Sequence, residues 1–318
     1  MQLLPTFKDI INAHDRIRAF IHQTPVLTSS NIDSITGSHI FFKCENFQKV
    51  GAFKYRGASN AVLSLPVGEA ARGVATHSSG NHAAALALAA KNRGIQCYVV
   101  MPRTAPKPKV DAVIHYGAKI TFCEPNLRSR EETLEGVVAA TGATVIHPYD
   151  NFQVISGQGT VAKELLESCP DLDAILAPVG GGGLLSGTAL ASKSLKPAIK
   201  VYGCEPANAD DAYRSFKTGK IVPSVDPKTI ADGLLTSLSE RTFTIIRNHV
   251  DDILTVQESS IIQAMLLVWQ RMKIIIEPSS AVALSALIDN HSLFAGKKVG
   301  IILSGGNADL LNLPFHAE

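Results

Sequence analysis

Four successive glycines follow an apolar run and precede a stretch with helical spacing: Gly180, Gly181, Gly182 and Gly183. Their backbone N–H groups can converge on one point, and the start of the following helix adds partial positive charge. A phosphate group suits such a place, although the sequence lacks the Lys-Ser/Thr pair of a nucleotide-binding P-loop. A plain turn is the alternative, but four glycines carry a large entropic cost for a turn alone. The run therefore predicts a phosphate-binding loop.

A lysine lies between two aromatic residues in the segment Gly51–Ala58, where Phe53 precedes Lys54 and Tyr55 follows it. Removal from water would lower the pKa of this amine and make it nucleophilic, as a Schiff base with an aldehyde requires. An isolated lysine is more often a surface residue whose stem covers apolar neighbours. The reactive interpretation of Lys54 therefore depends on the other motifs.

A polar cluster follows the predicted strand Gly73–His77 and opens a predicted helix; it contains Ser78, Ser79, Asn81 and His82. Hydroxyl groups and free N–H groups at a helix start can bind a carboxylate. Serine and asparagine are also ordinary helix caps, but this cluster holds more polar groups than capping needs. A serine hydrolase is excluded as the explanation because no Gly-x-Ser-x-Gly elbow is present.

A serine at the end of the last predicted strand, Ser304, could form a hydrogen bond with a ring nitrogen; a plain turn is the alternative. The four motifs together provide a phosphate site, a nucleophilic amine, a carboxylate site and a hydroxyl group. Pyridoxal 5′-phosphate acting on an amino acid uses all four.

An acidic segment, Glu205–Asp211, directly follows another predicted strand. Two carboxylates and a backbone carbonyl suit a hard divalent cation that prefers oxygen ligands. Acidic residues are also favoured at a helix start without any metal. Both interpretations remain open on this segment alone.

The elements that must position these motifs alternate between short apolar runs and segments of helical period. The expected strands are His39–Lys43, Gly73–His77, Gln96–Met101, Lys119–Cys123, Thr144–His147, Ala174–Pro178, Lys200–Cys204 and Val299–Leu303. The expected helices include Asn81–Arg93, Lys107–Tyr116, Arg130–Ala140, Val161–Ser168, Leu184–Ser194 and Ser259–Met272. Apolar strands that alternate with helices indicate an α/β fold with parallel sheets covered on both faces. Ligands of such sheets bind beyond the carboxyl ends of the strands, where the motifs fall.

Composition restricts the class of protein. A length of 318 residues fits two domains, and 46% hydrophobic against 18% charged residues argues against disorder. The net charge of +2 is a weak argument for nucleic acid or an anionic membrane as a partner, since both usually bind concentrated basic patches. Five widely spaced cysteines without a CxxC pair argue against a disulfide framework or a zinc site. No signal peptide or membrane span is visible, so a cytoplasmic location is expected.

The sequence resembles the fold-type II pyridoxal-phosphate enzymes, within them the serine racemase and serine/threonine dehydratase group. The resemblance runs from Thr24–Thr28 to Ser304–Asn307, with the segments Phe53–Gly57 and Ser78–His82 and the four glycines in the family's order. It implies a fold like the β-subunit of tryptophan synthase, with two doubly wound parallel-sheet domains. The large domain is expected at residues 1–72 and 149–318, and the small domain at 73–148.

The resemblance also implies site residues. Lys54 would hold the cofactor as an internal aldimine, and the other cofactor-binding residues would be Phe53 on the ring, Asn81 at the ring hydroxyl, Gly180, Gly181, Gly182, Gly183 and Leu184 at the phosphate, and Ser304 at the pyridine nitrogen. The substrate would meet Ser78, Ser79, Asn81, His82 and Arg130. A Mg²⁺ ion, or Ca²⁺ or Mn²⁺ in its place, would be held by Glu205, the carbonyl of Ala209 and Asp211. Family members are usually dimeric, so a homodimer with a small amino-acid substrate is expected.

Ser79 favours one activity within this group. Threonine-specific dehydratases usually carry alanine at this position, whereas serine racemases carry serine. Racemisation needs a proton donor or acceptor on each face of the substrate, and Lys54 and Ser79 would serve one face each. Because a serine faces the pyridine nitrogen, elimination should compete, so serine racemisation with serine and threonine dehydration is expected. The alternatives are a 3-hydroxyaspartate dehydratase, an L-threonine dehydratase and a non-catalytic protein that binds a phosphate ligand.

Overall fold

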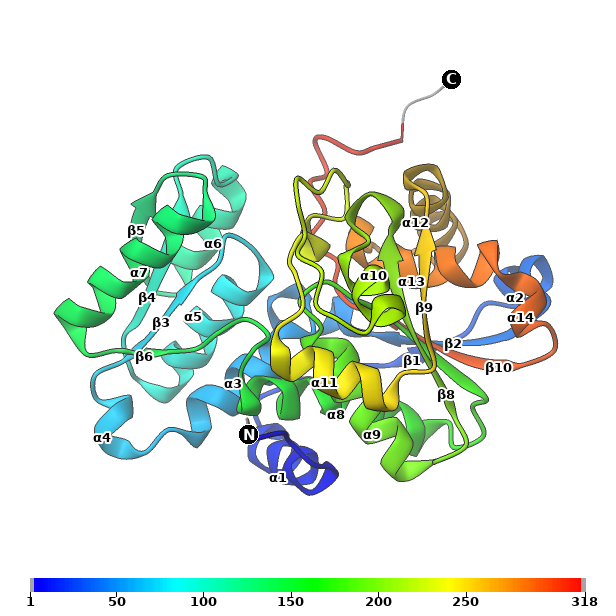
Figure 1. Cartoon of the computed structure of the whole chain (residues 1–318), viewed down its shortest axis with the longest axis horizontal. Coiled ribbons are helices and arrows are strands. Elements are labelled where there is room, and N and C mark those ends of the chain that lie inside the picture. Colours follow the sequence, from blue (N-terminus) through cyan, green and yellow to red (C-terminus); the bar gives the residue numbers. More distant parts are fainter. Residues whose placement is uncertain (1–2, 316–318) are drawn as a thin grey trace.

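The apolar strands of this chain assemble into two separate sheets. The computed structural model describes residues 3–315, and Figure 1 shows a larger sheet on the right and a smaller one on the left. The larger sheet has the order β1-β2-β10-β7-β8-β9 and the smaller one the order β5-β4-β3-β6. Strand β1 pairs with β2 in the antiparallel sense, and the other pairings between these strands are parallel. The expected α/β fold with two parallel sheets is confirmed.

Ten strands form the two sheets. The larger sheet contains β1 (Val26–Leu27), β2 (His39–Cys44), β7 (Ala174–Pro178), β8 (Lys200–Pro206), β9 (Asp252–Val256) and β10 (Lys298–Leu303). The smaller sheet contains β3 (Val74–His77), β4 (Cys97–Pro102), β5 (Lys119–Cys123) and β6 (Thr144–Val145).

Helices and short 3₁₀ turns connect the strands. The α-helices are α1 (Phe7–Ile17), α2 (Ser30–Thr36), α3 (Lys54–Ser64), α4 (Val67–Ala70), α5 (Asn81–Arg93), α6 (Lys107–His115), α7 (Leu127–Thr141), α8 (Phe152–Ser168), α9 (Gly183–Leu195), α10 (Asp211–Thr218), α11 (Glu240–His249), α12 (Glu258–Met272), α13 (Pro278–Asp289) and α14 (His291–Phe294). The 3₁₀ turns are η1 (Glu45–Phe47), η2 (Lys49–Gly51), η3 (Ala207–Ala209) and η4 (Asp232–Leu234).

Both faces of the larger sheet are buried under helices. In β7, Ala174 and Leu176 pack in one apolar cluster with α12 and α13, whereas Ile175 and Ala177 pack in another with α8 and α9. Successive side chains of a strand point to opposite faces, so this split places helices on both sides of the larger sheet. It also explains why the strands are apolar throughout rather than alternating.

One predicted helix begins in the wrong place. The prediction Val161–Ser168 misses the first part of α8, which begins at Phe152. Gly157 and Gly159 lie inside this continuous helix as contact points with its neighbours. A Cβ atom at Gly157 would lie 2.6 Å from Cα of Gly57, and one at Gly159 would lie 2.6 Å from Cδ1 of Ile10. Glycine is needed here because neighbouring helices approach the backbone of α8 closely.

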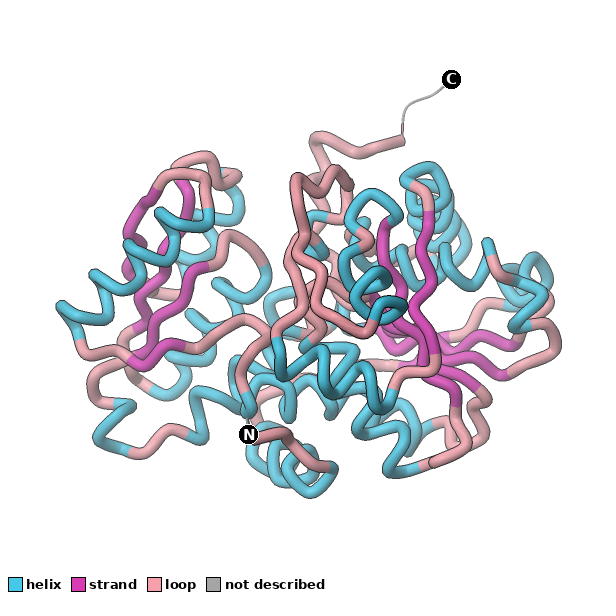
Figure 2. Tube along the Cα trace, in the orientation of Figure 1, coloured by secondary structure: helices cyan, strands magenta, loops and turns pink. Residues whose placement is uncertain are grey.

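The smaller sheet is built from one continuous stretch of chain, whereas the larger sheet uses both ends. Figure 2 shows the two groups of strands in magenta, well separated and joined by loops and helices. The expected division into residues 73–148 and the two flanking parts remains a prediction that agrees with this arrangement. No helix within residues 3–315 is both long and apolar enough to cross a membrane.

Candidate active site

Lys54 occupies the first position of α3 and is half-buried. Its Nζ atom donates a hydrogen bond to the carbonyl oxygen of Pro148 at 3.1 Å and lies 5.1 Å from the centre of the Phe53 ring. Burial lowers the pKa of Lys54 to about 8, although the charge of Glu277 opposes this shift. A larger fraction of the amine is therefore neutral near neutral pH than for an exposed lysine, as a nucleophile requires.

The loop at the carboxyl end of β3 presents free hydrogen-bond donors. The Ser78 hydroxyl accepts a hydrogen bond from the N–H of Gly80 at 3.4 Å, and Ser79 lies between them, half-buried. Helix α5 begins directly after the loop, and the N–H groups of Asn81 and His82 make no hydrogen bond within residues 3–315. Unpaired N–H groups at a helix start attract an anion, so the loop can receive a carboxylate.

The Asn81 side chain is fixed from two directions. Its Nδ2 atom donates to both carboxylate oxygens of Glu277, at 2.9 and 3.1 Å, and its Oδ1 atom accepts from Nδ2 of Asn307 at 2.8 Å. Burial raises the pKa of Glu277 to about 7. Glu277 therefore belongs to the site, and the sequence analysis missed it. Its signal was a single acidic residue between the apolar Ile274–Ile276 and Pro278, a context that calls for a polar partner.

His82 is buried below the loop. Its Nε2 atom lies 3.1 Å from the carbonyl oxygen of Ile146, so Nε2 carries the proton that this hydrogen bond needs. Burial, assisted by the charge of Lys54, lowers the pKa of His82 to about 3, so the ring is neutral. The Nδ1 atom has no partner within the described residues. The expected contact of His82 with a substrate carboxylate remains a prediction, and Nε2 is already used.

Arg130 lies on α7 of the smaller sheet's half and is half-buried. Its Nε atom has no hydrogen-bond partner within residues 3–315. After burial, the charge of Arg130 is the next cause of the lowered pKa of His77, so the guanidinium lies near the end of β3. Arg130 thus offers a cationic group with an unpartnered Nε atom near the end of β3, the strand that leads to Ser78.

The four glycines form a tightly enclosed loop between β7 and α9. A Cβ atom at Gly181 would lie 2.3 Å from Cδ1 of Tyr149, and one at Gly180 would lie 2.9 Å from Cα of Leu234. Gly182 has a φ of +85°, which favours glycine. Within the described residues, no N–H group from Gly180 to Leu185 has a hydrogen-bond partner. A loop with free amides and no side chains at a helix start fits a phosphate group.

The end of β10 joins the lysine segment to the rest of the site. The carbonyl oxygen of Ser304 accepts a hydrogen bond from the N–H of Phe53 at 3.0 Å, and Ala52 forms a β-bridge with Gly305. The buried Ser304 is therefore hydrogen-bonded through its backbone to Phe53, the residue that precedes Lys54. Segments far apart in the sequence meet here, as the sequence motifs require.

Two buried carboxylates lie together after β8. Glu205 accepts hydrogen bonds from the N–H groups of Ala212 and Tyr213, at 3.0 and 2.8 Å, whereas both oxygens of Asp211 lack partners within residues 3–315. Burial raises the pKa of Glu205 to about 9 and that of Asp211 to about 6. No group of three or more His, Cys, Asp or Glu side chains in the described chain could hold a metal ion. A cation here would need a further donor beside the two carboxylates, such as the Ala209 carbonyl, and the unpartnered carboxylate of Asp211 fits a cation ligand.

Comparisons of sequence and structure show which known proteins this chain resembles. The family model described as pyridoxal-phosphate dependent enzyme matches residues 17–305. The chain is 53% identical to a β-hydroxyaspartate dehydratase of Paracoccus denitrificans, over 98% of this chain and 99% of the relative. It is 52% identical to a serine racemase of Arabidopsis thaliana, over 96% and 93% of the two chains.

A solved structure agrees. The crystal structure of the serine racemase of Dictyostelium discoideum superposes with a TM-score of 0.93 at 52% identity, covering 96% of this chain and 99% of that one. The glycine loop, the half-buried lysine and the free amides beyond β3 thus occur in a chain whose sequence and fold agree with these proteins throughout. The chain belongs to the family of pyridoxal-phosphate dependent enzymes, with the type II fold.

Proposed function

We propose that the protein is a serine racemase that interconverts L- and D-serine and also dehydrates serine and threonine to the keto acid and ammonia. The observation that supports this most strongly is that the chain has both a half-buried Lys54 of lowered pKa and a serine, rather than an alanine, at position 79 of the substrate loop. The full-length similarity to serine racemases points the same way.

The cofactor site is proposed from the residues that fit it. Bound pyridoxal phosphate supplies an electron sink that makes the α-proton of an amino acid removable. The free amides from Gly180 to Gly183 and Leu184 would hold the phosphate, and Lys54 would hold the aldehyde carbon. Phe53 would lie on the ring, Asn81 at its hydroxyl and Ser304 at its nitrogen.

Two residues would move protons at the substrate α-carbon. Racemisation needs one acid–base group on each face, for which we propose the Lys54 amine and the Ser79 hydroxyl. Dehydration needs only Lys54 for the α-proton, so both reactions can share the site. Ser78 and the free N–H groups of Asn81 and His82 would bind the α-carboxylate and orient that carbon.

A second candidate function is dehydration of 3-hydroxyaspartate. The supporting observation is Arg130, whose Nε atom is buried without a partner and could bind a second carboxylate. The similarity to a β-hydroxyaspartate dehydratase also supports it. L-threonine dehydration without racemisation is less well supported, because Ser79 would then have no acid–base role.

We further propose a divalent cation at Glu205, Ala209 and Asp211, with Mg²⁺ as the expected ion and Ca²⁺ or Mn²⁺ as substitutes. The buried, unpartnered carboxylate of Asp211 supports this proposal, because buried acids without a cation are costly. A homodimer is proposed from the family resemblance.

The test is a product assay with the purified holoenzyme on L-serine, D-serine, L-threonine and 3-hydroxyaspartate. Chiral chromatography measures the enantiomers and a coupled assay measures the keto acids. The proposal predicts D-serine and pyruvate from L-serine. Keto acid from 3-hydroxyaspartate alone, with no reaction of serine, would replace the proposal with the second candidate.

A further inference from the structure

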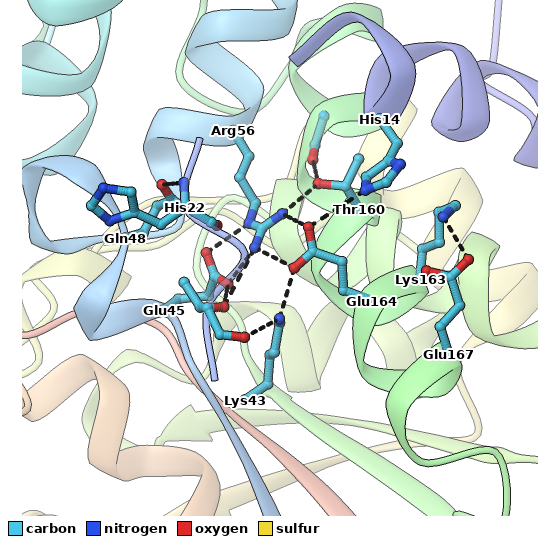
Figure 3. Close-up of polar contacts among 12 residues, drawn as sticks. His14, His22, Lys43, Glu45, Gln48, Arg56, Thr160, Lys163, Glu164 and Glu167 are labelled. Atoms are coloured by element: carbon cyan, nitrogen blue, oxygen red, sulfur yellow. Dashed lines mark hydrogen bonds and ion pairs between the residues drawn. The ribbon is translucent and has the colours of Figure 1, made fainter. Parts of the chain in front are cut away.

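A buried ion-pair network is centred on Arg56, two residues after the proposed catalytic lysine, and Figure 3 shows its contacts. Arg56 is fully buried between two carboxylates and uses every N–H of its guanidinium group. Its Nε and Nη2 atoms donate to Glu45 at 2.8 Å each, while Nη1 and Nη2 donate to Glu164 at 2.7 and 2.8 Å. Nη1 also donates to the hydroxyl of Thr160 at 3.1 Å. Arg56 therefore links η1, α3 and α8 through paired hydrogen bonds.

The network is balanced in charge. Lys43 on β2, also buried, donates from Nζ to Glu164 at 2.7 Å and to the carbonyl oxygen of Thr24 at 2.8 Å. Two cations thus face two anions, so no buried charge lacks a partner. Although burial opposes ionisation of Glu164, the nearby His14, the hydrogen bonds from Arg56 and the charge of Lys43 hold its pKa well below the usual range. The charged form of this carboxylate is therefore strongly favoured.

Arg56 lies in the first turn of α3, two residues after Lys54. The next residue, Gly57, donates its N–H to the side-chain oxygen of Gln158 on α8 at 3.1 Å. A Cβ atom at Gly57 would lie 2.8 Å from the carbonyl oxygen of Val154, so the two helices touch through their backbones. The start of α3 is therefore held on α8 by the close backbone approach at Gly57, by the hydrogen bond from its N–H group to Gln158, and by the hydrogen bonds from Arg56 to Glu164.

Helix α8 also starts close to the acceptor of the lysine amine. The carbonyl of Pro148, which accepts the Lys54 hydrogen bond, precedes Phe152 at the start of α8 by four residues. The backbone of Lys54 is therefore held on α8 through α3, and the carbonyl that accepts the hydrogen bond from its amine lies just before α8 in the chain. A shift of α3 along α8 would displace the amine relative to that acceptor.

We propose that Arg56, through Glu45 and Glu164, is a positioning residue that sets the place of the Lys54 amine in the site. The inference rests on the proposed function, in which Lys54 is the lysine linked to the cofactor. The planar guanidinium binds each of the two carboxylates through a pair of N–H groups, a geometry that the single ammonium group of a lysine cannot reproduce. A misplacement of about 1 Å at a reacting group costs on the order of 10²-fold in rate.

The experiment compares two Arg56 variants with a matched pair elsewhere. Arg56→Lys keeps the positive charge but loses the paired hydrogen bonds of the guanidinium group. Arg56→Met combined with Glu45→Gln removes one cation and one anion and leaves the Lys43–Glu164 pair intact. The control is Lys193→Met with Asp251→Asn, which breaks a partly buried ion pair between α9 and the start of β9. The readouts are kcat and KM for serine, the pH midpoint of the absorbance of lysine-linked cofactor, and Tm.

The positioning role predicts that kcat falls about tenfold to 100-fold in both Arg56 variants with KM little changed. The pH midpoint of the absorbance moves as well, because the surroundings of Lys54 change. The control lowers Tm alone. Wild-type kcat and pH midpoint in Arg56 variants of lowered Tm would overturn the inference and leave the network a purely structural one.

Two further measurements keep the result decisive. If the Arg56 variants do not fold, Glu45→Gln keeps Arg56 on Glu164, and the same change of kcat and pH midpoint is expected at smaller size; its absence overturns the inference. In Lys54→Ala the absorbance of lysine-linked cofactor must vanish. Its persistence would show that the proposed function assigned the wrong lysine, whereas its loss together with unaffected Arg56 variants would refute the positioning role alone.

Discussion

The amine of Lys54 donates a hydrogen bond to the carbonyl oxygen of Pro148 at a distance of 3.1 Å. This contact joins the start of α3 to the segment that leads from the smaller sheet into α8. A carbonyl acceptor holds the amine in place without supplying a full negative charge, so burial dominates and the pKa falls. The geometry thus prepares the amine for attack on an aldehyde.

The lowered pKa of Lys54 gives a prediction about pH. In the cofactor-free protein, the rate at which an amine reagent modifies Lys54, followed by mass spectrometry, should rise with a midpoint near pH 8. Unfolded lysine has the ordinary value of 10.5, so the unfolded chain binds more protons between these values. Stability should therefore increase as pH rises through this window, and Lys54→Met should remove that increase. A modification midpoint at the ordinary lysine value would contradict the environment described for Lys54.

Replacement of Ser79 should separate the two reactions. Ser79→Ala removes the proposed acid–base group on one face, and D-serine formation from L-serine should fall by about 10²- to 10⁴-fold. Pyruvate formation should change far less, because elimination uses Lys54. Ser78→Ala is the control, and it should raise KM for both reactions together. Equal loss of both activities in Ser79→Ala would show that Ser79 only helps to bind the substrate.

Arg130 should discriminate between substrates with one and two carboxylates. Arg130→Met should lower kcat/KM for 3-hydroxyaspartate by about tenfold or more, the value of one lost charged hydrogen bond, and lower that for serine much less. Arg128→Met is a matched control on the same helix, since Arg128 is exposed and pairs with Glu132. Parallel losses on both substrates would place Arg130 at the α-carboxylate instead.

The buried acids after β8 predict stabilisation by a divalent cation. Addition of Mg²⁺ should raise Tm, with a gain of about 2.7 kcal/mol when the ion is 100-fold above its Kd. Glu205→Gln should abolish the shift. Asp210→Asn should retain it, because Asp210 pairs with Arg214 rather than with the two buried acids. An unchanged Tm of the wild type with Mg²⁺, Ca²⁺ and Mn²⁺ would eliminate the cation site.

Local sequence signals predicted the local parts of the fold. Helix α5 has the predicted bounds, because Gly94 ends it in the left-handed conformation that glycine favours. Such a signal depends on neighbours in the chain. The prediction Val161–Ser168 missed the first part of α8, where Gly157 and Gly159 make contacts with other helices that local patterns do not reveal.

The motifs gave candidate site residues, but they did not predict how polar atoms pair across the fold. The Asn81–Glu277 hydrogen bond joins residues 196 positions apart, and nothing in the sequence around either residue indicates the other as its partner. The same holds for Arg56 and Glu164, which are 108 positions apart. Such pairs form only when the assembled sheets and helices bring distant segments together, so they can be identified only in the folded structure.

The central claim is that the protein exchanges the α-proton of serine on both faces. The most direct measurement incubates the holoenzyme with L-serine in deuterated water and analyses the recovered serine by chiral chromatography and mass spectrometry. The account predicts D-serine that carries deuterium at the α-carbon, together with pyruvate. Recovered serine that is entirely L, whether or not pyruvate forms, would contradict it.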